Sequence, residues 1–239
     1  EEPVLLLAHA DRYLLEEARR AVTLDIEELP AVFDLEESLA AETVIWGENN
    51  LFKSYLVEKG DVDEAWAQAD VILERTYSTG AQEQLYIEPQ GVIAEASPGS
   101  GVAVWGSLQC PYYVHKALVP LFALPKDKVR VVQTETGGGF GGKEEYPSMI
   151  AGHAALLAWK SGKPVKMVYD RAEDMVATTK RHPSRTRIRS AATRDGKLLA
   201  LDVDFAIDGG AYATLSAVVL SRGTIHAAAP YACPHVPVR

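Results

Sequence analysis

The chain has 239 residues, 47% of them hydrophobic, which is enough to bury one large core or two modest ones. Its net charge of -9 is unevenly spread, because acidic residues dominate up to residue 95 and basic residues after it. The basic residues form no dense cluster with interleaved aromatics, and no apolar run is long enough to cross a bilayer, so nucleic-acid binding and a membrane-spanning role are disfavoured.

The first part of the chain predicts the end of a small domain followed by a connector. Helical spacing covers residues 14–22 and 34–40, and the alternation of residues 23–27 is typical of an edge strand. The chain begins with Glu-Glu-Pro-Val-Leu-Leu-Leu and no Met, as if entering a strand, so we expect a fragment. We interpret residues 1–40 as the C-terminal part of a small α/β domain whose first strands are missing, and residues 41–57 as a connector.

From residue 58 on, the pattern predicts helices mixed with strands. The segments expected to be helical are residues 61–69, 112–121 and 149–159. The segments expected to be strands are residues 71–79, 91–95, 102–107, 129–134, 165–169, 186–193 and 198–208. Asp61 is expected to cap its helix, and Asp195-Gly196 predicts a hairpin turn between the last two strands, because Asp-Gly suits positive φ. No βαβ repeat is evident, so the predicted fold class is α+β.

The most informative segment is residues 137–142, in which five of six positions are glycine. Such a bare backbone lets a large polar group approach the main chain closely. The segment leads into a helix that is expected to begin near Pro147, and N–H groups that open onto a helix N-terminus form an anion-binding concavity. Phe140 within the run, and Lys143 and Glu144 directly after it, indicate a cofactor site that also contacts a substrate. The alternative is a tight strand-to-helix turn.

Two familiar phosphate-binding loops fit this segment poorly. A P-loop needs Ser or Thr after its Lys to hold Mg²⁺, but Lys143 is followed by Glu144 and Glu145, whose charges oppose a nucleotide triphosphate. The dinucleotide-binding spacing can be drawn from Gly137 to Gly142, yet a glycine-packed run matches that pattern easily. Both loops are therefore disfavoured.

The segment Thr136-Gly137-Gly138-Gly139-Phe140-Gly141-Gly142-Lys143-Glu144 resembles the molybdenum-cofactor loop of the xanthine dehydrogenase and aldehyde oxidase family. Further matching segments follow the family's order, at residues 27–30, 82–88, 170–175 (at a strand end) and 181–183. The resemblance covers nearly the whole chain. It implies that residues 1–40 are the later part of an α/β-hammerhead domain and that residues 58–239 are the first part of a molybdopterin-binding domain.

The resemblance also implies roles for individual residues. Gln109 matches a glutamine whose amide hydrogen-bonds an oxygen ligand of the molybdenum, and a neutral donor orients such a ligand without changing the charge of the metal. The backbone of Gly138, Gly139, Phe140 and Gly141 would approach the pterin and the metal ligands. The Phe140 ring would form one wall of the substrate slot. No residue is expected to bind molybdenum directly.

Two further residues bear on the substrate. Glu144 and Arg222 match a glutamate and an arginine that face the purine in xanthine-oxidising members, whereas members that act on aldehydes usually lack the pair. Such an Arg stabilises negative charge that develops on the heterocycle during attack at carbon. The alternatives are a helix first-turn acid for Glu144 and a surface ion-pair partner after a strand end for Arg222.

Four other titratable residues are not assigned to a site. Glu83 and Glu88 would face opposite sides if they lie five residues apart on a strand. His153 and His182 have no metal-ligand partner at useful spacing, so both are expected to be structural.

The implied cofactor is molybdenum–molybdopterin, in its simple or its cytosine dinucleotide form. Iron–sulfur clusters and FAD are expected on other domains or subunits, since Cys110 and Cys233 cannot supply the four ligands of a cluster. The two cysteines match no disulfide spacing and suit a reducing compartment, so a cytoplasmic location is expected. The expected partners are the remainder of the molybdenum subunit, the iron–sulfur and FAD parts, and a small heterocyclic substrate.

The implied parent reaction is the oxidative hydroxylation of a purine-like N-heterocycle by water. The general-base glutamate of the family has no counterpart in this sequence, so the chain alone is not expected to turn over. An aldehyde or other N-heteroarene oxidoreductase of the same family is the first alternative. The second is a non-catalytic module for cofactor handling or subunit assembly.

Overall fold

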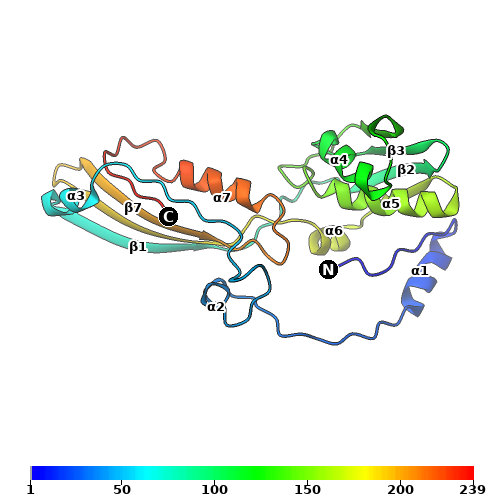
Figure 1. Ribbon diagram of the computed structural model, residues 1–239, viewed down its shortest axis with the longest axis horizontal. Helices are drawn as coiled ribbons and strands as arrows, with labels where there is room; N and C mark the ends of the chain where they lie inside the picture. The colour runs from blue at the N-terminus through cyan, green and yellow to red at the C-terminus, as the bar shows by residue number, and fades with distance from the viewer. Residues whose placement is uncertain (1) are drawn as a thin grey trace. The chain divides into compact units, whose positions relative to one another are not determined.

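The computed structural model describes residues 2–239, which form two compact units (Figure 1). Unit 1 contains Glu83–Lys180 together with the residues up to Glu27. Unit 2 contains Glu28–Gln82 and Arg181–Arg239. Each unit is thus built from two separate stretches of the chain, and each is described by itself.

Unit 1 is a four-stranded sheet with helices on one face. Its elements are α1 (Arg12–Ala21), β2 (Gly91–Ser97), β3 (Gly101–Gly106), α4 (Pro111–Leu121), a 3-10 turn (Lys126–Lys128), β4 (Val129–Gln133), α5 (Pro147–Ser161), β5 (Val165–Val168) and α6 (Arg171–Ala177). The strand order is β4-β3-β2-β5. β2 runs antiparallel to β3 and β5, whereas β3 and β4 are parallel and are joined through α4.

The core of unit 1 lies between the sheet and the helices α4 and α5. Alternation along β2 turns Val92, Ala94 and Ala96 inward, as expected for a strand with one buried face. α5 contributes small side chains at the contact, including buried Ala154 and Ala158, so that its backbone lies close to the strands. The helix ends at Gly162, whose positive φ matches a common way of ending a helix.

Unit 2 is built on a long antiparallel sheet of order β1-β6-β7. Its elements are α2 (Leu35–Ala40), α3 (Val62–Gln68), β1 (Val71–Thr79), β6 (Ser184–Ala192), β7 (Leu198–Ile207) and α7 (Ser216–Ile225). Residues 235–239 run parallel to β7, and the backbone N–H of Val203 donates to the carbonyl of Pro237 at 3.0 Å. α3 covers one end of the sheet, where buried Ala65 belongs to the same cluster as Ala191 and Ala200.

Most of the predicted elements are confirmed, and the mixed α+β class is correct. The predicted segments from residue 61 to residue 169 all form the expected helix or strand, with small differences at their ends. Asp61 caps α3 by accepting from the backbone N–H groups of Asp63 and Glu64. The turn between β6 and β7 contains Gly196 at φ +90°, as the Asp-Gly pair predicts.

Four predictions are wrong. The apolar residues 3–7 form no strand, although their pattern is typical of a strand entry. Residues 23–27 form no strand, because within residues 2–239 no neighbouring strand supplies hydrogen-bond partners for their backbone. Residues 170–175 are not a strand end but lead into α6, because the Asp170 side chain accepts from the backbone N–H of Glu173 at 2.8 Å and caps that helix. Arg222 does not follow a strand but lies within α7.

A glycine at the tight turn between β2 and β3 gives a test of the unit 1 fold. Gly101 has φ +85°, and a Cβ on it would collide with the backbone carbonyl of Lys128. Gly101→Ala is therefore expected to lower the free energy of unfolding by about 2 kcal/mol or more, measured by urea denaturation. Gly99→Ala is the matched control, because a Cβ there meets nothing within 4 Å. Equal stability of the two variants would contradict the proposed packing of this turn.

Candidate functional site

The candidate site lies at one edge of the unit 1 sheet. β3 and β4 are parallel, so their carboxyl ends meet at the same edge, and Gly106 at the end of β3 pairs with Gln133 at the end of β4. Gln109 follows the first strand and the glycine loop (residues 137–142) follows the second. In open sheets, such an edge beyond the carboxyl ends of parallel strands is a common place for ligands. The topology therefore explains why residues about thirty positions apart come together.

The glycine loop contains a tight turn that only a few residue types adopt easily. The backbone N–H of Gly142 donates to the carbonyl of Gly139 at 2.7 Å, which closes a four-residue turn. Both central residues have positive φ, +51° at Phe140 and +93° at Gly141. An aromatic residue at positive φ is strained, and such strain is concentrated at functional sites. The turn leaves the Phe140 side chain 75% exposed.

Gln109 is fixed by the loop that it contacts. Its Oε1 accepts from the backbone N–H groups of Gly141 and Lys143, each at 3.1 Å, and its own backbone N–H donates to the Lys143 carbonyl at 2.7 Å. A Cβ on Gly139 would collide with the same amide group, lying 2.7 Å from its Cδ. Because Oε1 is already occupied, Nε2 is left as the donor end of Gln109.

Three successive backbone N–H groups of the loop have no acceptor within residues 2–239, those of Gly138, Gly139 and Phe140. Unpaired N–H groups that follow one another in a glycine-rich turn form a concavity suited to anions and oxygen ligands. Together with Nε2 of Gln109, they give the site several hydrogen-bond donors.

An ion pair between a buried lysine and a half-exposed glutamate lies beneath the loop. Lys143 is completely buried, and its Nζ contacts Glu88 Oε2 and Ser107 Oγ, each at 2.9 Å. Nζ also lies 4.7 Å from the centre of the Tyr86 ring. Burial by itself raises the pKa of Glu88, but the hydrogen bonds from Ser107, Lys143 and Gly137 outweigh it and hold that pKa below its usual range.

A second buried network supports the far end of the loop. Gln90 Nε2 donates to the Gly142 carbonyl at 2.9 Å and to the Tyr86 hydroxyl at 3.0 Å. The Tyr86 hydroxyl in turn donates to Asp174 Oδ1 at 2.7 Å, while Oδ2 of Asp174 accepts from the Gln90 backbone at 2.6 Å. Burial and the bond to Asp174 raise the pKa of Tyr86 far above its ordinary value, so the phenol stays protonated. The loop is therefore held by side-chain hydrogen bonds at both of its ends.

The structure brings some of the predicted site residues together within unit 1, and one belongs to unit 2. Gln109, Phe140 and the neighbouring glycines form one cluster. Glu144 follows the loop closely in the sequence and influences Cys110. Burial of the Cys110 thiol raises its pKa, and the negative charge of Glu144 raises it further. Arg222 belongs to unit 2, on the exposed side of α7.

The sequence reasoning missed the role of Glu88. Glu83 and Glu88 do not lie on a strand but in the loop before β2, and each pairs with a different lysine. The signal for Glu88 is Lys143 directly after the glycine run, because a lysine buried there needs an anionic partner. Of the two histidines expected to be structural, His182 lies 2.8 Å from buried Ser216 through Nε2, and burial lowers the pKa of both His153 and His182.

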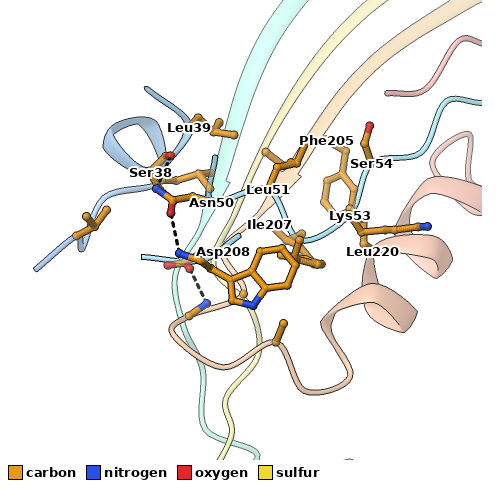
Figure 2. A pocket seen from close by; sticks show the side chains of 18 of the residues that line it. Ser38, Leu39, Asn50, Leu51, Lys53, Ser54, Phe205, Ile207, Asp208 and Leu220 are labelled. Carbon is orange, nitrogen blue, oxygen red and sulfur yellow. Dashed lines mark hydrogen bonds between the residues drawn. The ribbon is translucent and has the colours of Figure 1, made fainter. Parts of the chain in front are cut away.

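A separate cavity of about 410 Å³ lies in unit 2 (Figure 2). Its walls are mostly apolar and include Trp46, Phe205 and Leu220. The Asn50 side chain bridges Ser38 and the segment 43–46, and Oδ1 of Asp208 accepts from the Gly210 backbone at 2.8 Å. These polar groups are therefore occupied, and the lining also includes Lys53, Ser54 and Asp204.

The strain at Phe140 predicts a difference between two substitutions. Phe140→Ala keeps a Cβ at positive φ, whereas Phe140→Gly removes it, so the glycine variant is expected to be more stable by about 1 kcal/mol in urea unfolding. Phe33 is the control, because it is exposed and does not have positive φ. There the alanine variant should be the more stable one, because glycine makes the unfolded chain more flexible. An alanine variant at Phe140 as stable as the glycine variant would show that the turn is not strained.

Comparisons with known proteins agree with this geometry. The model of the molybdopterin cofactor-binding domain family matches residues 46–239. The chain is 38% identical over 226 residues to the nicotinate dehydrogenase large molybdopterin subunit of Eubacterium barkeri, covering 94% of this chain and 53% of that protein. It is 33% identical over 236 residues to a probable xanthine dehydrogenase subunit of Bacillus subtilis (strain 168), covering 98% of this chain and 31% of that protein.

Solved structures show the same fold. The aldehyde oxidoreductase from Desulfovibrio gigas matches with a TM-score of 0.86 and 26% identity, covering 95% of this chain and 25% of that one. Quinoline 2-oxidoreductase from Pseudomonas putida 86 matches in fold, with a TM-score of 0.79 over 96% of this chain and 30% of that one, at 24% identity. The chain spans about half or less of the length of these relatives. Because the family model covers most of the described residues, the chain belongs to the molybdopterin cofactor-binding domain family.

Proposed function

We propose that this chain is part of the molybdenum-binding subunit of a molybdenum hydroxylase that uses water to hydroxylate a purine-like N-heterocycle. The observation that carries the proposal is the row of unpaired N–H groups at Gly138, Gly139 and Phe140 beside the free Nε2 of Gln109. Relatives named as xanthine and nicotinate dehydrogenase subunits support the same class of enzyme.

The donor set fits the cofactor. The loop N–H groups would bind oxygen and sulfur atoms of the cofactor, and Gln109 would donate from Nε2 to an oxygen at the metal. The exposed Phe140 ring would form a wall against a flat substrate. When bound, the molybdenum cofactor supplies the two-electron redox chemistry, and the chain supplies placement and electrostatics.

Glu144 and Arg222 are proposed as the residues that position the substrate. The Glu144 carboxylate would accept from a ring N–H, and the Arg222 guanidinium would stabilise charge that develops on a ring oxygen. The Arg222 side chain is exposed and forms no ion pair within residues 2–239, so its donors are available. The general base is expected from another part of the subunit, and the isolated chain is expected to be inactive.

The wider assembly is part of the proposal. Iron–sulfur clusters and FAD would be carried by other domains or subunits, and the enzyme would act in the cytoplasm. We further propose that residues 1–40 belong to an α/β-hammerhead domain, that residues 41–57 connect it to the cofactor-binding domain of residues 58–239, and that the pterin is in its simple or cytosine dinucleotide form. No helix within residues 2–239 is long and apolar enough to cross a membrane.

A pyridine carboxylate is the second candidate substrate. The relative with 38% identity is named a nicotinate dehydrogenase subunit, and this supports a smaller N-heteroarene. Arg222 suits this substrate as well, because a guanidinium pairs with a carboxylate through two parallel hydrogen bonds. An aldehyde substrate is less favoured, since it has neither a ring N–H nor an anionic group for Glu144 and Arg222.

The proposed role of Arg222 is tested in the full-length parent enzyme with its partner subunits. Arg222→Met is expected to lower kcat/KM for the heterocycle by about 100-fold, because a charge-assisted interaction in the transition state is lost. The molybdenum and pterin content should not change. Assays with xanthine, nicotinate and benzaldehyde separate the candidates. Oxidation of benzaldehyde alone, or an unchanged rate on the heterocycle in Arg222→Met, would rule out the role of Arg222.

Cofactor analysis tests the enzymatic proposal itself. The purified parent protein is expected to contain about one molybdenum and one pterin per subunit, since the donors of the loop need a ligand to satisfy them. Gly139→Ala should abolish this loading, because its Cβ would displace the Gln109 amide. Wild-type protein without either component would favour the non-catalytic module.

A further inference from the structure

The polar residues beneath the glycine loop, of which Lys143 and Ser107 are buried and Glu88 is half-exposed, carry an inference that rests on the proposed function. We propose that Glu88, Lys143 and Ser107 form a clamp that positions the loop for the cofactor. None of the three is proposed to touch the substrate. Their role is to hold the backbone N–H groups of the loop in place.

The geometry of Glu88 explains how the clamp works. One carboxylate oxygen, Oε2, accepts from the backbone N–H of Gly137 at 2.7 Å and from Lys143 Nζ at 2.9 Å. Gly137 and Lys143 stand at the two ends of the loop. A single oxygen atom therefore ties both ends, and the three unpaired N–H groups lie between them. The tie limits how far those N–H groups can move.

Ser107 completes the clamp from the sheet. Its hydroxyl donates to Glu88 Oε2 at 2.6 Å and accepts from Lys143 Nζ at 2.9 Å. Ser107 directly follows β3, and its backbone N–H donates to the Gly91 carbonyl at 3.2 Å, so it is anchored to two strands. The rigid sheet thus sets the position of the ion pair, and the ion pair sets the position of the loop.

Stability alone does not account for this arrangement. Taking a lysine fully out of water costs energy that its partner only partly repays, and well-packed apolar residues often replace buried ion pairs without loss. Lys143 is nevertheless completely buried next to an anionic partner whose oxygen also binds the loop backbone. The hydrogen bonds of a charged pair are directional, whereas apolar contacts are not. The pair therefore suits a role in positioning the loop.

Unit 1 contains a second lysine–glutamate pair that serves as a matched control. Lys180 Nζ lies 2.8 Å from Glu83 Oε2, and both side chains are largely buried. Within the described residues, no hydrogen bond joins either of these side chains to residues 137–142. Removing this pair should affect stability without affecting the loop.

The test uses the full-length parent enzyme and compares Lys143→Met with Lys180→Met. At a temperature at which circular dichroism shows both variants folded, Lys143→Met is expected to release pterin about ten-fold faster than wild type, measured by pterin fluorescence. Lys180→Met should release it at the wild-type rate. Amide hydrogen exchange at residues 137–143 should rise in Lys143→Met only, and Lys143→Arg should restore part of the protection.

A milder variant covers the case in which Lys143→Met does not fold. Ser107→Ala keeps the ion pair but removes its anchor to the sheet, so about three-fold faster pterin release and faster exchange of the loop amides are expected. Equal release and exchange in the Lys143 and Lys180 variants, or wild-type values in Ser107→Ala, would overturn the clamp. Hydrogen exchange tests the clamp even in protein without cofactor, whereas a lack of cofactor in wild type would count against the proposed function instead.

Discussion

The double hydrogen bond from the loop to Gln109 is the interaction on which the site depends. A glutamine amide has one acceptor atom and one donor group, and here Oε1 is occupied by the N–H groups of Gly141 and Lys143. This fixes which end of the amide is free. It also requires the loop to fold back on Gln109, which the left-handed turn at Phe140 and Gly141 makes possible. The orientation of one side chain and the strain of one turn are therefore parts of the same arrangement.

The conformational strain of this turn is offset by side chains that bind the loop from the sheet edge, and not by contacts within the loop. The loop itself has few side chains and buries little apolar surface, so it cannot stabilise its own conformation. Instead, Glu88, Gln90 and Gln109 each bind a different part of its backbone. All three residues lie just before β2 or just after β3, at one edge of the sheet. The antiparallel β2–β3 pair and the parallel β3–β4 pair together bring these supports beneath the loop.

Local signals predicted most of the fold, and long-range contacts explain the errors. Asp61 and Gly196 act through their immediate neighbours, so their capping and turn roles could be predicted from short patterns. The alternation of residues 23–27 is equally local, but a strand also needs a partner, which no short pattern reveals. Asp170 directly follows the predicted strand that forms β5, which suggests a strand end, although its carboxylate begins α6.

The site shows the same division. The glycine run predicts the loop, and the resemblance to a known family predicts a role for Gln109. Glu88 could not be found in this way, because its partner Lys143 is 55 residues away and the pair forms only when the sheet edge is assembled. A lysine in a sequence is usually a solvated surface group, and only the burial of Lys143 in the structure shows that its charge must be matched by a partner.

The division of the chain into two units has a consequence for how the proposed function is distributed. The loop, Gln109 and their supports all belong to unit 1, whereas Arg222 belongs to α7 in unit 2. Under the proposed function, the sheet edge of unit 1 would thus supply the contacts to the cofactor. Arg222 on α7 of unit 2 would stabilise charge on the substrate. Under the same proposal, a substitution at Arg222 would change the contact to the heterocycle, whereas the hydrogen bonds that hold the loop all lie within unit 1. Relatives with one fold and differently named substrates are what such a separation would produce, since the chemistry of the cofactor stays constant while the contacts to the substrate vary.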